Sequence, residues 1–468
     1  MSLRWPGGLR SLAMLLALCV TQTVVAEETI NFGRFGTISI YKNSDQPKHV
    51  VLFVSGDDGW VLGVKDMARA LADKDSLVAG IDVAYYLKQL SKSQDKCSYP
   101  AGEFENLSHF LQKKYGFKHY VLPVLVGYSS GATLVYATQV QGPPNTFRGA
   151  MSLGFCPDLP LDKPFCQGLG DLQSEALANG KGIAFLPAKN LLTPWVVLHG
   201  AVDQVCAASV VEKFISQTPN ASVVDLPNVG HGFSVPNNWM PSFLQTFEQL
   251  VGSHDDVAIN NSTALSGLPV IEEQVSGVND TLAVIVSGDG GWASIDRGLA
   301  IALNAKGISV VGLDSLQYFW SARTADEMGK DMGRMISHYV SAWGKKKVLL
   351  IGYSRGADVV PFMVTHLPEN VAAQISFIAL LGAEHSINFE FRITDWLPGA
   401  SAPAQYQVVA EVKKLAGRNL MCLYGSDESD TICPELDQKV FKVVKMEGGH
   451  HFGGDYQKLA ETILSEAP

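Results

Sequence analysis

The stretch Val348–Pro361, VLLIGYSRGADVVP, decides how the rest of the chain is interpreted. A run of apolar residues ends in GYSRG (352–356), and a segment of helical character follows. This is the G-x-S-x-G pattern in the strand, turn and helix context that it needs. Small residues at both ends allow a sharp turn, which would lift the Ser354 hydroxyl to a strand end and a helix N-terminus. We therefore expect Ser354 to be a nucleophile.

The first half of the chain repeats this stretch and its neighbours in the same order. Six landmarks match, which indicates two copies of one domain. The matched pairs are VVLFVSGDDGW (50–60) with LAVIVSGDGGW (282–292), LVAGID (77–82) with ISVVGLD (308–314), VLVGYSSGA (124–132) with LLIGYSRGA (349–357), AMSLGF (150–155) with FIALLG (377–382), WVVLHGAVD (195–203) with LMCLYGSD (420–427), and GHGF (230–233) with GHHF (449–452).

The segments between the landmarks have helical character. Thr324 and Glu327 form a capping box that opens an amphipathic run to about residue 343, and residues 295–304 and 455–465 also indicate helices. Strands that alternate with helices favour a mostly parallel sheet covered on both faces. We predict two tandem α/β-hydrolase-like domains, at 27–252 and 270–468, joined by a polar linker at 253–269. Residues 270–274 are expected to begin the second sheet.

The first 26 residues have the features of a signal peptide. Arg4 and Arg10 form a cationic region, Ser11–Val20 is apolar, and small or modest residues end the segment at Ala26. The apolar run is short for a membrane span, although an uncleaved inner-membrane anchor is the alternative. We expect an exported, periplasmic protein.

The net charge and the number of cysteines limit which classes of protein the chain can belong to. The formal net charge is −10, so nucleic-acid binding is disfavoured. Six cysteines follow the signal segment, an even number that permits disulfides in an exported protein. Cys422 and Cys433 bracket one short loop and are the expected pair, whereas the pairing of Cys97, Cys156, Cys166 and Cys206 stays open. The spacing of these residues predicts no metal site and no cofactor.

A serine nucleophile needs a base and an acid, which follow it in this order in α/β-hydrolases. The acid is expected at Asp430, which like Asp203 stands three residues before a cysteine, with Asp427 as the alternative. The base is expected at His450, with His451 as the alternative.

The first domain has the same three residue types, at Ser129, Asp203 and His231. They form a possible second site. Against it stand Asp58, which takes the place of Gly290, and the tendency of duplicated domains to lose activity.

Other residues near these landmarks are candidates for binding. Two backbone amides must stabilise the oxyanion, and Arg355 and the loop at Asp289 and Gly290 are expected to supply them. Trp292 is expected to form an apolar wall, and Glu384 follows a strand end where it can line the pocket.

The second domain resembles the bacterial virulence proteins AcvB and VirJ in SGDGGW, GYSRGADVVPF, LLG, YGSDESDTIC and GGHHF. VirJ resembles the second half alone, whereas AcvB-type proteins carry both halves and a signal peptide. The resemblance implies a periplasmic serine hydrolase that removes lysine or alanine from aminoacylated phosphatidylglycerol. It carries the nucleophile, acid and base onto Ser354, Asp430 and His450.

A substrate of this kind would bring a cationic amino group to the site. Asp289, Asp358 and Glu384 are the expected acidic neighbours. Two alternatives stay open: an exported esterase or lipase for another acyl ester, and a non-catalytic periplasmic factor that assists a secretion system.

Overall fold

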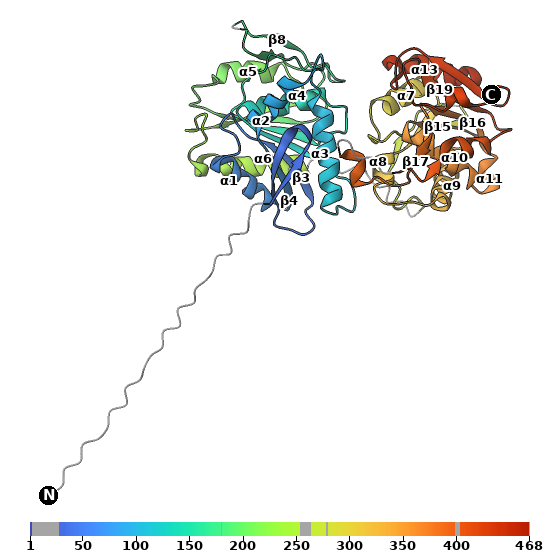
Figure 1. Cartoon of the computed structure of the whole chain (residues 1–468), viewed down its shortest axis with the longest axis horizontal. Helices are drawn as coiled ribbons and strands as arrows, with labels where there is room; N and C mark the ends of the chain where they lie inside the picture. Colours follow the sequence, from blue (N-terminus) through green and yellow to red (C-terminus); the bar gives the residue numbers. More distant parts are fainter. Residues whose placement is uncertain (2–27, 179, 253–263, 278, 398–402, 468) are drawn as a thin grey trace.

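The computed structural model describes residues 1, 28–178, 180–252, 264–277, 279–397 and 403–467 of the 468-residue chain. The predicted signal segment, apart from Met1, and residues 253–263 of the predicted linker lie outside them. Figure 1 shows two domains side by side, the N-terminal one coloured blue to yellow-green and the C-terminal one yellow to red. We use "N-terminal domain" for residues 28–252 and "C-terminal domain" for residues 264–467.

The N-terminal domain is built on a mixed sheet of eight strands in the order β1-β2-β4-β3-β5-β6-β10-β11. The pairs β1–β2 and β2–β4 are antiparallel, and the rest of the sheet is parallel. The strands are β1 (Glu28–Phe32), β2 (Gly36–Tyr41), β3 (His49–Val54), β4 (Ser76–Ile81), β5 (Val124–Tyr128), β6 (Gly149–Leu153), β10 (Trp195–Gly200) and β11 (Ala221–Leu226).

The C-terminal sheet repeats this order without an equivalent of β1: β12-β14-β13-β15-β16-β19-β20. Only its edge strand β12 is antiparallel to its neighbour. The strands are β12 (Val270–Glu273), β13 (Thr281–Val286), β14 (Ser309–Leu313), β15 (Lys347–Tyr353), β16 (Ile375–Leu381), β19 (Leu420–Gly425) and β20 (Lys442–Met446). The shared order confirms the predicted fold of two tandem α/β-hydrolase-like domains.

Helices and short strands complete both domains. Helices in the N-terminal domain are α1 (Leu62–Ala72), α2 (Val83–Lys92), α3 (Pro100–Lys114), α4 (Ser130–Gln141), α5 (Ala208–Ser216) and α6 (Met240–Gly252). Those in the C-terminal domain are α7 (Ser294–Ala305), α8 (Ser315–Tyr318), α9 (Ala325–Ala342), α10 (Arg355–Thr365), α11 (Glu369–Ala372), α12 (Val408–Lys413) and α13 (Tyr456–Glu466), with the 3-10 turn η3 (Ile393–Trp396). Small sheets join β7 (Asp158–Leu159), β9 (Ile183–Phe185) and β8 (Ser174–Ala176), and β17 (Ser386–Ile387) with β18 (Tyr406–Gln407).

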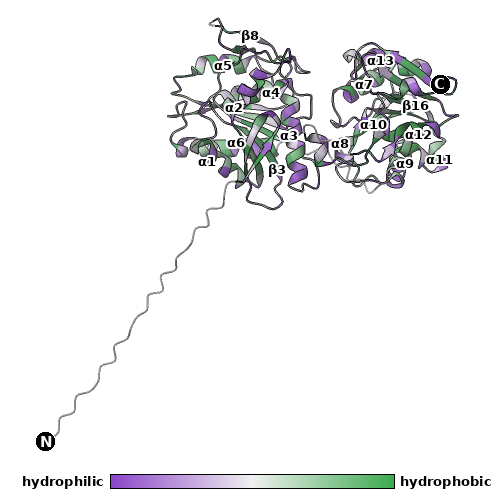
Figure 2. Ribbon diagram, in the orientation of Figure 1, coloured by the Kyte–Doolittle hydropathy of each residue, from purple (hydrophilic) through white to green (hydrophobic). Residues whose placement is uncertain are grey.

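The central strands are buried on both faces, which is why they are apolar without a break. Along β3, Val50, Leu52 and Val54 pack into one core cluster, while Val51 and Phe53 pack into another on the opposite face. The alternate residues of β13 divide between two clusters in the same way. Figure 2 shows the apolar strands inside each domain and helices with mixed polarity around them.

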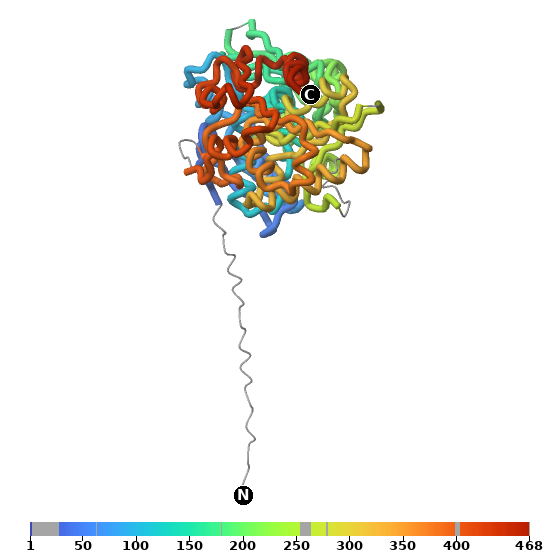
Figure 3. The backbone as a smooth tube through the Cα atoms, turned by 90° about the vertical axis from the view of Figure 1, so that its right-hand side faces the viewer, coloured from blue at the N-terminus to red at the C-terminus, as the bar shows by residue number. Residues whose placement is uncertain are grey.

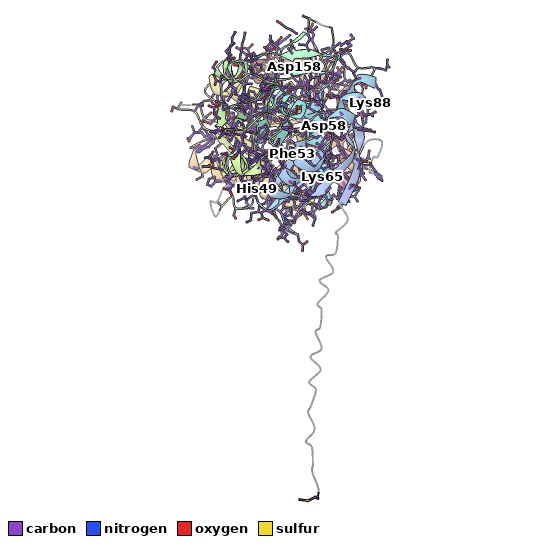
Figure 4. All side chains as sticks on the ribbon, turned by 90° about the vertical axis from the view of Figure 1, so that its left-hand side faces the viewer. His49, Phe53, Asp58, Lys65, Lys88 and Asp158 are labelled. Carbon is purple, nitrogen blue, oxygen red and sulfur yellow. A yellow bond between two sulfur atoms is a disulfide. The ribbon has the colours of Figure 1, made fainter. Side chains whose placement is uncertain are left out.

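Parallel strands bring the loops that follow them to one edge of the sheet, where ligands bind in open α/β folds. Figure 4 shows His49, Phe53 and Asp58 in this order along β3 and the loop after it. The loops after β5, β6 and β10 begin at the same edge of the sheet because these strands run parallel to β3.

Several local predictions are confirmed. The capping box of Thr324 and Glu327 opens α9, β12 begins at Val270, and α7 and α13 cover the predicted helical runs. In the described part of the predicted linker, Leu265 and Leu268 are buried in the C-terminal core.

Three disulfides link cysteines within the domains. The predicted Cys422–Cys433 pair is present, and the four remaining cysteines pair as Cys97–Cys166 and Cys156–Cys206. Such bonds are typical of exported proteins. In the ranges that the structure describes, no helix has the length and apolar character needed to cross a membrane.

The two domains meet at α3, which packs against η3. The Trp320 indole donates to the Phe117 carbonyl at 2.7 Å, and its ring lies beside those of Tyr120 and Trp396. Figure 3, viewed along the long axis, shows the C-terminal domain in front of the N-terminal domain.

Candidate active site

Both predicted serines sit on sharp turns between a strand and a helix. Ser354 has φ 52° and ψ −121°, and Ser129 has φ 53° and ψ −124°, a conformation that a non-glycine residue seldom adopts. A Cβ added to Gly356 would lie 2.0 Å from the Val286 carbonyl oxygen. The turn is therefore possible only with glycine at that position.

His450 is held by Glu428 in the C-terminal domain. Its Nδ1 pairs with Glu428 Oε1, while Glu428 Oε2 accepts a hydrogen bond from the Gly425 amide. The adjacent His451 instead places its Nδ1 3.1 Å from the Tyr353 hydroxyl. Of the two histidines that were considered, His450 is thus the one with a carboxylate partner.

The expectation that Asp430 or Asp427 would hold the histidine is wrong. Asp430 lies 2.8 Å from Nδ1 of a different histidine, His385, whose Nε2 is 2.7 Å from Glu435. Asp427 is exposed and accepts a hydrogen bond from the Ser426 hydroxyl. The loop after β19 turns Glu428 inward because the Glu428 amide bonds back to the Gly425 carbonyl.

Ser354 and His450 both adjoin the turn after β16. The Ser354 amide donates to the Leu381 carbonyl at 2.8 Å, and a Cβ on the next residue, Gly382, would lie 2.8 Å from His450 Cε1. This turn needs a glycine because its φ is +64° and the imidazole fills the adjacent space. The backbone of Ser354 and the imidazole of His450 thus adjoin the same turn.

The N-terminal domain contains a complete hydrogen-bonded triad. Ser129 Oγ is 3.0 Å from His231 Nε2, and His231 Nδ1 is 2.8 Å from Asp203 Oδ2. The other carboxylate oxygen of Asp203 accepts hydrogen bonds from the amides of Val205 and Cys206. All three residue types expected in this domain are thus in mutual contact.

Each site has a glycine beside its serine, two residues after the end of a strand. A Cβ on Gly288 would lie 3.5 Å from Ser354 Cβ, and one on Gly56 would lie 3.2 Å from Ser129 Cβ. The expected oxyanion donors, the amides of Asp289 and Arg355, directly follow Gly288 and Ser354 in the sequence. A Cβ on Gly290 would meet no atom within 4 Å, so this residue leaves open space.

Asp358 is buried under the C-terminal site instead of facing a ligand. Its Oδ1 accepts a hydrogen bond from the Glu384 amide at 2.7 Å, so it holds the loop that carries Glu384. Burial raises the pKa of Asp358 well above its usual range. The neutral form of Asp358 is favoured, which leaves Asp289 and Glu384 as the exposed acids of the site, although burial and the charge of Asp430 raise the pKa of Glu384.

The Arg355 side chain is also held in place by contacts within the protein. Its guanidinium donates to the Asn388 carbonyl at 2.9 Å and stacks on Phe391 at 3.8 Å. The side chain therefore braces the loop after β17, while its backbone amide remains at the start of α10.

The expectation that Trp292 forms a wall of the site is wrong. Its side chain is only 2% exposed and packs against Gly312 of β14, in the core. The Trp292 amide bonds to Asp314, which anchors the loop of Asp289 to the end of β14.

The surroundings lower the pKa of the acid, Glu428, and raise the pKa of the base, His450. Burial raises the pKa of Glu428, but hydrogen bonds from His450 and Gly425 outweigh it and lower that pKa. The hydrogen bond to Glu428 raises the pKa of His450, and the charges of Glu384 and Asp289 add to this effect. Ser354 on its elbow and an imidazole that a carboxylate orients are the groups needed for nucleophilic acyl transfer.

Glu428 was missed although the sequence holds a signal for it. Asp203 stands three residues after the strand-ending Gly200, and Glu428 stands three residues after Gly425. The cysteines used for alignment belong to different disulfides, since Cys206 pairs with Cys156 and Cys433 pairs with Cys422.

Solved structures resemble single domains of this chain. They include an esterase domain from a Rhodothermus marinus protein (15% identity, TM-score 0.33, 47% of this chain and 97% of that one). A thermophilic esterase from Thermogutta terrifontis (12%, 0.35, 50% and 95%) and dienelactone hydrolase from Anabaena variabilis (14%, 0.35, 48% and 96%) are similar in the same way. No curated protein matches the chain.

The sequence model of one family, described as "Bacterial virulence protein (VirJ)", matches residues 48–151 and 280–467. The first segment includes β3 to β5 and Ser129, and the second includes Ser354, Glu428 and His450. Together the two segments span more than half of the chain. The chain therefore belongs to the VirJ family of bacterial virulence proteins.

Proposed function

We propose that the C-terminal domain is a serine carboxylic-ester hydrolase that removes the amino acid from aminoacylated phosphatidylglycerol in the periplasm. The observation that carries this proposal is the pairing of His450 with Glu428 at the turn that also contacts Ser354, a serine on a nucleophile elbow. The family membership and the exposed carboxylates of Asp289 and Glu384 support it.

The reaction would take place in two steps. Ser354 Oγ attacks the ester carbonyl while His450 Nε2 accepts the hydroxyl proton, and the amides of Arg355 and Asp289 stabilise the oxyanion. The bond to the glycerol oxygen breaks, and His450 returns the proton to the departing phosphatidylglycerol. A water molecule, activated by His450, then releases the amino acid from Ser354.

The charges around the site favour a substrate with an amino group. Glu384 and Asp289 both raise the pKa of His450 through their charges, which indicates that they act at the site itself. The Arg355 guanidinium, in contrast, is engaged by Asn388 and Phe391. An ammonium group close to the ester would therefore lie near the carboxyl groups of Glu384 and Asp289, while the lipid tails remain in the membrane.

Vesicles that contain lysyl- or alanyl-phosphatidylglycerol test this proposal. We expect the protein without its signal segment to release free lysine or alanine, and Ser354→Ala to abolish the release while remaining folded by circular dichroism. Release by the folded Ser354→Ala variant at the wild-type rate would contradict the proposal. Hydrolysis of simple esters without release from either lipid would support an esterase for another substrate, and no hydrolysis of any ester would support a non-catalytic factor.

A further inference from the structure

The triad of the N-terminal domain has every contact that a working serine hydrolase needs. Ser129, His231 and Asp203 are joined by contacts of 3.0 and 2.8 Å. The Asp203 side chain is fully buried and the His231 side chain is 17% exposed, so the acid is shielded while the base reaches the surface of the site. This is the division of exposure expected when one group orients the base and the other meets a substrate.

The charge on Asp203 is maintained in the buried position. Burial raises its pKa, but hydrogen bonds from Cys206, His231 and Val205 outweigh that effect and lower it. A scaffold without chemistry gains nothing from a buried carboxylate that points at a histidine, because desolvating a charge costs free energy. The strained φ of 53° at Ser129 is likewise kept, at about 1–3 kcal/mol.

Groups for an oxyanion are also present. Gly56 lies against Ser129, and the Ser130 hydroxyl donates to Asp57 Oδ1 at 2.7 Å. This bond links the residue after the nucleophile to the residue after Gly56. The two backbone amides that would receive the oxyanion are therefore held at a set separation.

The wall beside the base differs between the two sites. The loop after β6 is next to His231, as the loop after β16 is next to His450. Cys156, which forms a disulfide with Cys206, takes the position of Glu384 in the N-terminal site. Thr133 takes the position of Asp358. Thr133 uses its hydroxyl to bond the Cys156 carbonyl. Cys156 and Thr133 thus bring no charge to this side of the site, and the acids near Ser129 lie instead in the loop after β3, at Asp57 and Asp58.

We propose that Ser129, with His231 and Asp203, forms a second, independent hydrolase site for acyl esters. Ser129 Oγ bonds to the ester carbonyl carbon and its proton moves to His231 Nε2. The carbon–oxygen bond to the alcohol breaks, and the alcohol leaves with that proton. Water then adds to the acyl-enzyme, giving the carboxylic acid and restoring Ser129. The overall reaction consumes one ester and one water molecule.

Single and double serine variants of the full chain test this assignment. The probes are p-nitrophenyl butyrate, an uncharged ester, and a fluorophosphonate that bonds covalently to activated serines. Ser129→Ala, Ser354→Ala, the double variant and the control Ser216→Ala, an exposed serine on α5, are compared. Peptide mass spectrometry identifies the labelled residue, and circular dichroism establishes that each variant is folded.

We expect the fluorophosphonate to label Ser129 in the Ser354→Ala variant, and His231→Ala to abolish this labelling. Butyrate hydrolysis in the Ser354→Ala background should fall by about 10³-fold or more on adding Ser129→Ala, because a triad nucleophile is removed. Absence of label at Ser129, or butyrate hydrolysis that depends on Ser354 alone, would overturn the proposal. Failure of the lipid hydrolysis assigned to Ser354 would leave both of these readouts unaffected.

Discussion

Glu428 and Asp430 lie two residues apart and have different partners. Glu428 orients His450, while Asp430 and Glu435 flank His385. Only a carboxylate on the base's Nδ1 fixes its tautomer and stabilises the imidazolium that forms during acyl transfer. The two acids therefore provide a matched pair of substitutions.

Glu428→Gln should reduce kcat/KM of the Ser354 reaction by about 10³–10⁴-fold, because the base loses its orienting charge. Asp430→Asn changes a charge in the same loop without touching His450, so its activity should stay within about threefold of the wild type. Release of amino acid from lipid vesicles measures both. Equal losses in the two variants would contradict the assignment.

The pH dependence of the Ser354 reaction should reflect the environment of His450. The hydrogen bond that His450 donates to Glu428, together with the charges of Glu384 and Asp289, raises its pKa above 6.5. The base must be neutral, so kcat/KM should rise with pH through a midpoint above 6.5. Glu384→Gln should move this midpoint to lower pH. A midpoint at or below 6.5 in the wild type would count against the account.

The elements of the fold could be predicted because their signals are local. Apolar strands such as β13, the glycine elbow and the capping box of α9 each depend on a few adjacent residues. The acid could not be assigned as safely, because its position depends on how the loop after β19 folds back onto Gly425. Trp292 was misjudged because its packing against Gly312, a residue of another strand, is not visible in the sequence.

The elbow itself offers a test at this scale. In Gly356→Ala the new Cβ would lie 2.0 Å from the Val286 carbonyl oxygen of the adjacent strand. This contact is with backbone, so it can be relieved only by moving the strand or the helix. We expect a loss of about 1–3 kcal/mol in the free energy of unfolding. Gly290→Ala is the control, since its Cβ meets nothing within 4 Å. Urea unfolding of the two variants should differ clearly, and equal midpoints would refute the argument.

At the scale of the whole molecule, the N-terminal domain reaches the surroundings of the C-terminal site. Helix α3 packs on η3, and the Asn145 side chain donates to the Trp292 carbonyl at 3.3 Å. Burial raises the pKa of Glu105 on α3 to about 8, and the charge of Asp289 contributes. A carboxyl of one domain thus lies close to the candidate oxyanion loop of the other.

The raised pKa of Glu105 predicts that the free energy of unfolding depends on pH. The unfolded chain releases the Glu105 proton near pH 4.5 and the folded chain near pH 8, so folding loses stability as pH rises between these values. Glu105→Gln should remove this loss, with a gain over the wild type that grows between pH 5 and pH 8 by on the order of 2–4 kcal/mol. Urea unfolding at the two pH values measures it, with Glu212→Gln, an exposed position, as the control. An equal gain at both pH values would contradict the burial of Glu105.

The most direct test of the central claim is to trap the acyl-enzyme. The protein is mixed with alanyl-phosphatidylglycerol vesicles, quenched in acid within the first turnovers, digested and examined by peptide mass spectrometry. We expect an alanyl group on the peptide that contains Ser354, and none in Ser354→Ala. Continued release of alanine without any alanyl group on Ser354, or an alanyl group on Ser129 alone, would contradict it.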